Sequence, residues 1–144
     1  MVVPDANLLI YAYDTKSPWH RASRRWWENV LSGAEPVGIP WVVVLGFVRL
    51  ITHPTLLENP LTVQQAHTAV REWLDCDHVQ LLVPREPTFG RFFSLLEEAG
   101  LGGNLATDAL VAAHAEDFGA TVYSNDRDFD RFSGIRRKNP LAQT

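Results

Sequence analysis

The N-terminal segment is Val2-Val3-Pro4-Asp5-Ala6-Asn7-Leu8-Leu9-Ile10-Tyr11, an apolar run interrupted by one carboxylate and one carboxamide. Its composition predicts a buried strand over residues 2–5 and a helix over residues 7–13. Asp5 would then lie at the carboxyl end of the strand, where ligands bind in open α/β sheets. The alternative is that Asp5 only caps the following helix, as Asp often does. Pro4 is unusual here, because proline removes a backbone donor from a strand.

Strands and helices are expected to alternate along the rest of the chain. Helices are expected over residues 18–31, 40–51, 62–74, 88–99 and 104–118, and further strands over residues 37–39, 79–83, 121–123 and 135–137. Residues 40–51 are too apolar for periodicity to separate helix from strand, and the length of the run with Pro40 at its start favours a helix. The alternation predicts an α/β fold with a mainly parallel central sheet and helices on both faces. At 144 residues the chain is expected to form a single domain over residues 1–144.

The composition excludes several classes of protein. Cys76 is the one cysteine, which excludes an internal disulfide and a cysteine-rich zinc site and fits a cytoplasmic protein. No apolar stretch is long enough to cross a bilayer and no signal peptide is recognisable, so no membrane association is expected. The net charge of −4 does not indicate a nucleic-acid-binding protein by itself.

Two further aspartates occupy positions comparable to that of Asp5. On the helix expected over residues 104–118, Asp108 shares a face with Val111 and Ala115, so its side chain should point toward the sheet. A charged side chain is rarely placed there without a partner, and a buried salt bridge to an arginine is the simpler alternative. Asp126 follows the strand expected over residues 121–123.

The acidic run after this strand has the spacing Asp126-x-Asp128-x-Asp130, which is similar to the start of a calcium-binding loop. The rest of that loop pattern fails, because Arg131 replaces the required glycine and Arg137 replaces the final glutamate. Asp128 and Asp130 are therefore interpreted as turn residues.

Three acids at residues 5, 108 and 126 would repel one another at one sheet edge unless a divalent cation were present. Donor sets made only of oxygen favour Mg²⁺ or Mn²⁺ over zinc. Such a site activates water and neutralises charge on an attacked phosphodiester. The pattern therefore indicates phosphoryl chemistry.

Two clusters of basic residues and a group of tryptophans complete the pattern. The basic clusters are Arg21, Arg24 and Arg25, and Arg127, Arg131, Arg136, Arg137 and Lys138. Arginine suits phosphate, although a solvated helix face and a polar tail are the simpler interpretations. Trp19 and Trp26 are expected on one face of the helix over residues 18–31. Trp27 must point elsewhere. The simpler interpretation is that all three tryptophans pack in the core, and the alternative is that Trp27 or a neighbouring helical residue anchors a protein partner in an apolar groove.

The chain resembles a PIN domain over essentially its whole length. The resemblance rests on Asp5-Ala6-Asn7, Thr107-Asp108-Ala109 and Ser124-Asn125-Asp126-Arg127-Asp128-Phe129. The segment Pro40-Trp41…Gly46-Phe47-Val48-Arg49…Thr52-His53-Pro54 is similar to one branch of the VapC toxins of bacterial toxin–antitoxin pairs.

The resemblance implies a Mg²⁺-dependent endoribonuclease, for which Mn²⁺ could substitute, that is usually a homodimer and is held inactive by a small antitoxin protein. It implies Asp5, Asp108 and Asp126 as catalytic and metal-binding residues. Asn7, Arg49 and Asp128 are implied as supporting residues.

Gly46 departs from the family pattern, which usually has a glutamate at this position. The alternative function is therefore a catalytically weak or inactive PIN-fold module that binds RNA or protein. Other enzyme classes lack required residues. A haloacid-dehalogenase-like phosphatase needs an aspartate where Asn7 stands, the segment His114-Ala115-Glu116 lacks the paired cysteines of a zinc deaminase, and no Gly-x-Ser-x-Gly motif supports a serine hydrolase.

Overall fold

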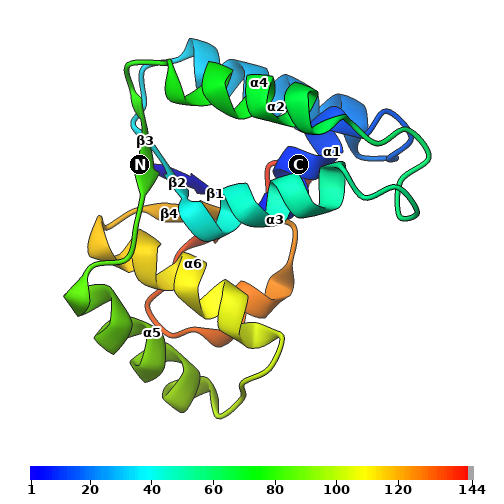
Figure 1. Cartoon of the computed structure of the whole chain (residues 1–144). Helices are drawn as coiled ribbons and strands as arrows, with labels where there is room; N and C mark the ends of the chain where they lie inside the picture. Colours follow the sequence, from blue (N-terminus) through cyan, green and yellow to red (C-terminus); the bar gives the residue numbers. More distant parts are fainter. Residues whose placement is uncertain (143–144) are drawn as a thin grey trace.

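The computed structural model describes residues 1–142 and contains, within that range, one five-stranded sheet (Figure 1). The strands are β1 (Val2–Pro4), β2 (Val37–Pro40), β3 (Val79–Leu82), β4 (Thr121–Tyr123) and β5 (Arg137–Lys138). Their order in the sheet is β3-β2-β1-β4-β5, and every neighbouring pair is parallel. The predicted parallel sheet is therefore confirmed, although the last strand begins two residues later than expected and ends one residue later.

Helices cover both faces of this sheet. They are α1 (Ala6–Tyr13), α2 (His20–Ser32), α3 (Trp41–Ile51), α4 (Val63–Leu74), α5 (Glu86–Ala99) and α6 (Leu105–Asp117), with a short 3-10 helix η1 (Arg127–Arg131) after β4. Figure 1 shows α2 and α4 on one side and α5 and α6 on the other, with α3 between the two groups. The predicted α/β architecture is confirmed. None of the helices described here is both long and apolar enough to span a bilayer.

Pro4 is accommodated in the central strand because of the side that it faces. Alternate residues direct their N–H groups to the same neighbouring strand, so Pro4 shares the side of Val2, whose N–H donates to the Pro36 carbonyl at 2.8 Å. Within residues 1–142, β1 and β2 pair only at Val2↔Val37, so the strands have separated before Pro4. On the other side, the pairing with β4 continues as the Asp5 N–H donates to the Tyr123 carbonyl at 2.9 Å.

An aromatic cluster fills the core between α1, α2, α3 and α4. Trp73 packs edge-on against Trp27 and Phe47, with ring centroids 5.6 Å and 4.8 Å away, and its indole N–H donates to the Tyr13 hydroxyl at 2.9 Å. Burial of a large aromatic side chain and satisfaction of its polar atom both favour the folded state. The cluster therefore holds α1, α2, α3 and α4 together.

The orientation of α2 differs from the expected one. Trp27 is only 2% exposed and belongs to the core, whereas Trp19 is largely exposed and Trp26 is half-buried, stacked on Tyr123 at 5.6 Å. The interpretation that the tryptophans pack in the core is confirmed for Trp27 and wrong for Trp19, and Trp27 itself cannot be the anchor for a partner. Sequence spacing predicts that Trp26 and Trp27 diverge but not which of them points inward, because the contact between Trp27 and Trp73 decides that.

Most helix boundaries follow local signals. The capping box at the start of α4 is confirmed, since the Thr62 N–H donates to Gln65 at 2.9 Å and the Gln65 N–H donates to the Thr62 hydroxyl at 3.1 Å. Helix α2 begins at His20 rather than at residue 18, because a turn closed by the Ser17 carbonyl and the His20 N–H precedes it. Helix α5 begins at Glu86, two residues earlier than expected.

Candidate metal centre

The strand order reverses beside β1, and the acidic residues follow the two strands at that point. The chain proceeds outward from β1 to β2 and β3, and then returns to place β4 on the opposite side of β1. Open α/β sheets bind ligands at the carboxyl ends of the strands where the order reverses. Asp5 follows β1 directly, and the segment from Ser124 to Asp126 follows β4.

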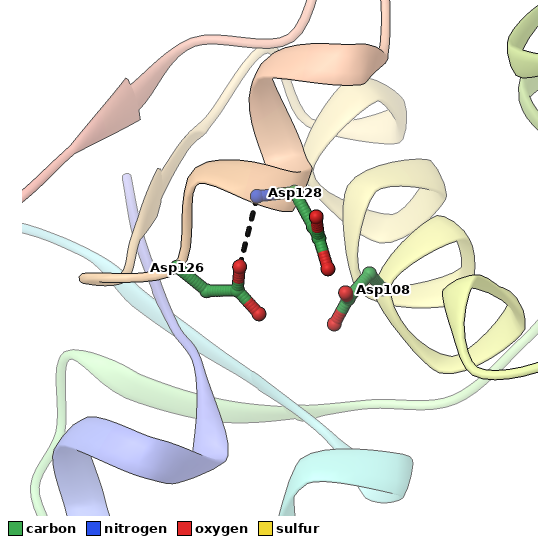
Figure 2. A group of neighbouring side chains, drawn as sticks. All are labelled: Asp108, Asp126 and Asp128. Carbon is green, nitrogen blue, oxygen red and sulfur yellow. Dashed lines mark hydrogen bonds between the residues drawn. The ribbon is translucent and has the colours of Figure 1, made fainter.

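Three carboxylates meet at this edge. Asp108, Asp126 and Asp128 each contribute an oxygen, and these oxygens all lie within 4.8 Å of one another. Figure 2 shows Asp108 projecting from α6 toward the two aspartates of the segment that follows β4. We call these three residues the carboxylate cluster. Asp108 and Asp126 are brought together as predicted, and Asp128 joins them instead of being only a turn residue.

The start of η1 fixes the spacing of two cluster members. Asp126 caps this helix, and its Oδ1 accepts a hydrogen bond from the Asp128 N–H at 2.8 Å (Figure 2). The second oxygen of Asp126 is left for another contact. The local backbone therefore holds Asp126 and Asp128 in place before any ligand arrives.

Asp5, which the sequence places with Asp108 and Asp126, is not one of the three cluster residues but is linked to Asp126 through Ser124. Asp5 is 7% exposed, and its Oδ2 accepts a hydrogen bond from the Ser124 hydroxyl at 2.7 Å. The same hydroxyl oxygen accepts from the Asp126 N–H at 2.9 Å. Asp5 occupies the N-cap position of α1, and its side chain makes no capping hydrogen bond there.

The acids are held in an environment that opposes their ionisation. Burial raises the pKa of Asp5, while the Ser124 hydrogen bond opposes that rise and the charge of Asp126 adds to it. The pKa of Asp108 is raised to about 7, mainly by burial and then by the charges of Asp5, Asp126 and Asp128.

Three of these acids have no ion-pair partner in the part of the chain that the structure describes. Among residues 1–142, no lysine, arginine or histidine forms a salt bridge with Asp5, Asp108 or Asp126. Asp128 does have a partner, Arg131, at 3.3 Å. The alternative that Asp108 is held by a buried salt bridge to an arginine is therefore not supported.

The carboxylate cluster fits a small divalent cation. Octahedral Mg²⁺ with oxygen ligands at about 2.1 Å places pairs of ligands roughly 3.0 to 4.2 Å apart. Oxygens within 4.8 Å of one another need only a small contraction to reach that geometry. The donors are all carboxylate oxygens, which suit Mg²⁺ or Mn²⁺ rather than zinc.

Arg137 of β5 braces the segment that carries the cluster. Its guanidinium donates to both carboxylate oxygens of Asp130, at 2.9 and 3.0 Å, and to the Ser124 carbonyl at 3.1 Å. Asp130 is thus an ion-pair partner, consistent with its interpretation as a turn residue. Neither Ser124 nor Arg137 was assigned a specific role from the sequence. A small polar residue after a strand and an arginine near the C-terminus are too common to reveal these roles.

The remaining predicted residues are not part of the carboxylate cluster. Asn7 is half-buried in the first turn of α1, and Arg49 is exposed on α3. Gly46, also on α3, faces the start of α1, since a Cβ added there would lie 3.6 Å from the Ala6 Cβ. Position 46 is therefore close to the residue that follows Asp5, and the space there accepts a side chain.

Comparison with known proteins identifies relatives over nearly the whole chain. The PIN domain family model matches residues 2–135. Ribonuclease VapC37 of Mycobacterium tuberculosis is 41% identical over 142 residues, covering 99% of this chain and 99% of the relative. Ribonuclease VapC33 of the same organism is 34% identical over 143 residues, covering 99% of this chain and all of the relative.

Solved structures show the same fold at lower sequence identity. M. tuberculosis VapC20, described as a toxin that cleaves the sarcin–ricin loop, aligns with a TM-score of 0.71 and 17% identity, covering 94% of this chain and 99% of that one. VapBC2 from Rickettsia felis, bound to a DNA fragment from its promoter, aligns with a TM-score of 0.68 and 19% identity, covering 96% and 98%.

Proposed function

The chain belongs to the PIN domain family, and on that basis we propose that it is a VapC-type toxin that hydrolyses RNA. Relatives at 34 and 41% identity over nearly the full length are named ribonucleases. The observation that carries the proposal is the carboxylate cluster, in which three oxygens approach within 4.8 Å and Asp108 has no positively charged partner among the described residues.

In this proposal Asp108, Asp126 and Asp128 hold Mg²⁺, with Mn²⁺ as a substitute. Asp5, linked to Asp126 through Ser124, adds negative charge to the site. The bound cation supplies an activated water and neutralises charge on the phosphodiester. Ser124 keeps Asp5 oriented and holds the Asp126 backbone. Arg137 keeps the segment after β4 in place, so the acids are arranged before the substrate binds.

We also propose a small antitoxin protein as partner, homodimer formation and action in the cytoplasm. Several solved structures of the same fold are complexes of a toxin with its antitoxin, including VapBC2. Because Trp27 is buried, exposed residues must supply the protein contacts. Trp41 and Leu45, one turn apart on α3, are 51% and 54% exposed and suit that role.

Cleavage of a mixed RNA pool tests the activity. The wild type should cleave RNA in Mg²⁺ and not in EDTA, and Asp108→Asn and Asp126→Asn should each lose at least about 100-fold in rate, as expected when metal-mediated charge stabilisation is lost. Asp77→Asn is the matched control, because Asp77 is exposed and precedes β3. It therefore lies at the amino ends of the parallel strands, opposite the carboxylate cluster.

The same assay decides the alternative function. Wild-type protein that binds RNA but shows no metal-dependent cleavage would be a binding module, as the missing carboxylate at Gly46 allows. Cleavage that survives in Asp108→Asn and Asp126→Asn would show that the carboxylate cluster is not the active site.

A further inference from the structure

A surface pocket is lined by the two residues that flank Asp126 in the chain. It has a volume of about 500 Å³ and is lined by Trp19, Asn125, Arg127, Asn139, Leu141 and Ala142. Asn125 and Arg127 are the chain neighbours of Asp126 on either side, and consecutive Cα atoms are about 3.8 Å apart. Two lining residues of the pocket are therefore next to Asp126 along the chain, and the pocket's volume is in the range of small-ligand sites.

We propose that this pocket, which we call the base pocket, binds one unpaired nucleobase of the RNA next to the phosphate that is cleaved. The base would stack on Trp19, its edge would meet the amides of Asn125 and Asn139, and Arg127 would contact a neighbouring phosphate. This inference rests on the proposed ribonuclease function and assigns part of its substrate recognition.

Trp19 has the properties of a stacking platform. Its backbone is fixed, because its N–H donates to the Ser17 hydroxyl at 3.1 Å and its carbonyl accepts from the Ser23 N–H at 2.9 Å. Its side chain nevertheless remains 43% exposed at the start of α2. A half-exposed indole on a fixed backbone loses little freedom when a base stacks on it, and every base offers such a face.

Arg127 differs from the other arginines of the C-terminal basic cluster, because their side chains make contacts within the protein. Arg131 pairs with Asp128, Arg136 donates to the Gly119 carbonyl, and Arg137 pairs with Asp130. Arg127 is exposed and, among residues 1–142, makes no salt bridge or side-chain hydrogen bond. Its guanidinium therefore remains available for a phosphate, which it can contact with two parallel hydrogen bonds.

The two asparagines supply donors and acceptors for a base edge. The Asn139 Oδ1 accepts a hydrogen bond from the Leu141 N–H at 3.0 Å, which fixes the carboxamide and leaves its NH₂ group as a donor. Side-chain amides suit the edges of unstacked bases in single-stranded RNA. Amides, a guanidinium and one aromatic ring together favour a nucleotide over a peptide, whose docking grooves are mainly apolar.

Binding of a fluorescently labelled single-stranded RNA, measured by anisotropy in EDTA, tests the base pocket without cleavage. Trp19→Ala should weaken binding roughly 5- to 150-fold, which corresponds to the loss of one stacked base. Trp19→Phe should keep most of the affinity. Phe118→Ala is the matched control, because Phe118 is 44% exposed but precedes β4, at the opposite edge of the sheet.

The charge of Arg127 has a separate readout. Arg127→Gln should lower the slope of log Kd against log salt by about 0.7, the value for one contact to a single strand, and Arg127→Lys should restore it. Arg71→Gln, on the last turn of α4, should leave the slope unchanged.

Abasic substitutions in the RNA locate the base directly. At one position of the RNA, an abasic site should lower the affinity of the wild type as much as Trp19→Ala does. The same abasic site should not lower the affinity of the Trp19→Ala protein any further. Equal losses in both proteins at every position would overturn the base pocket. The Arg127 series does not use Trp19→Ala, so it tests the pocket even if that variant fails to fold.

The outcomes separate this inference from the function on which it rests. Absence of metal-dependent cleavage by the wild type would refute the ribonuclease proposal and the base pocket together. Cleavage with unchanged RNA affinity in Trp19→Ala would refute the base pocket alone. If Trp19→Ala weakened only the complex with a co-expressed antitoxin, the pocket would be a protein-docking site, which also contradicts the inference.

Discussion

At the scale of single residues, Ser124 determines how the acids are held. Its hydroxyl donates to Asp5 and accepts from the Asp126 backbone, so one oxygen joins the ends of β1 and β4. Asp5 is 7% exposed, Ser124 itself is fully buried, and Asp126 is half-buried. Removal of the hydroxyl leaves a carboxylate oxygen and an N–H without their partner.

Ser124→Ala should therefore lower the free energy of unfolding by about 1–3 kcal/mol, the usual effect of leaving a buried polar group unpaired. It should also weaken metal binding, because Asp126 loses a backbone constraint. Urea unfolding and a metal titration of RNA cleavage measure the two effects. Ser94→Ala, at an exposed position of α5, is the control. Equal stability of the two variants would show that the Ser124 bridge contributes nothing.

Gly46→Glu should lower the Mg²⁺ concentration needed for half-maximal cleavage. The added side chain would start 3.6 Å from the Ala6 Cβ, near Asp5, and a further carboxylate increases the attraction for the cation. Gly46→Ala is the control, because it gains the roughly 1 kcal/mol of helix propensity without the charge. A folded Gly46→Glu protein with an unchanged or higher Mg²⁺ requirement would show that position 46 does not face the metal.

At the scale of elements, the segment from the end of β4 through η1 carries most of the site. It contributes two of the three cluster residues and is braced from β5 by Arg137. Arg137 makes a two-pronged contact with Asp130 that a lysine could not reproduce. The brace therefore depends on the geometry of the guanidinium as well as on its charge.

Arg137→Lys should loosen this segment while leaving the sheet intact. We expect faster amide hydrogen exchange over residues 124–131. Half-maximal cleavage should need a several-fold higher Mg²⁺ concentration, because the acids are held less firmly. Arg136→Lys is the control, since Arg136 contacts the Gly119 carbonyl at the other edge of the sheet. Unchanged exchange in Arg137→Lys would remove the bracing role.

The elements were largely predictable and their contacts were not. Apolar runs and glycine ends place α1, α3 and α6 to within about two residues, and helices α5 and α6 are each followed by a glycine with positive φ, Gly100 at 69° and Gly119 at 60°. Alternation of strands and helices brought Asp108 and Asp126 to one edge. The bond between Asp5 and Ser124 spans 119 residues of sequence, and no local pattern encodes it.

At the scale of the whole molecule, the strand order brings negative charges together at the carboxyl ends of the strands. Their ionisation lowers the stability of the folded protein. The unfolded chain loses the Asp108 proton near the ordinary pKa of 3.8, whereas the folded protein keeps it until about pH 7. Between these values the unfolded state binds fewer protons, so folding becomes less favourable as the pH rises. The penalty is absent below pH 3.8 and complete above pH 7.

The metal-free wild type should therefore lose thermal stability between pH 4 and pH 7 more steeply than Asp108→Asn, and the variant should have the higher Tm at pH 8. Mg²⁺ should raise the Tm of the wild type at pH 8 much more than that of the variant, because only the intact site binds it. Thermal unfolding in EDTA and in Mg²⁺ over this pH range measures both effects. Parallel curves for the two proteins would contradict the raised pKa of Asp108.

The central claim is that Asp108, Asp126 and Asp128 together hold the catalytic cation. A crystal of the wild-type protein grown with Mn²⁺ and measured for anomalous scattering tests it most directly. We predict an anomalous peak roughly 2.1 Å from an oxygen of each of the three carboxylates, as oxygen ligation of a small divalent cation requires. Asp126→Asn, grown in the same way, should show a much weaker peak or none. A Mn²⁺ peak elsewhere, or an empty cluster in crystals of protein that cleaves RNA with Mn²⁺, would contradict the claim.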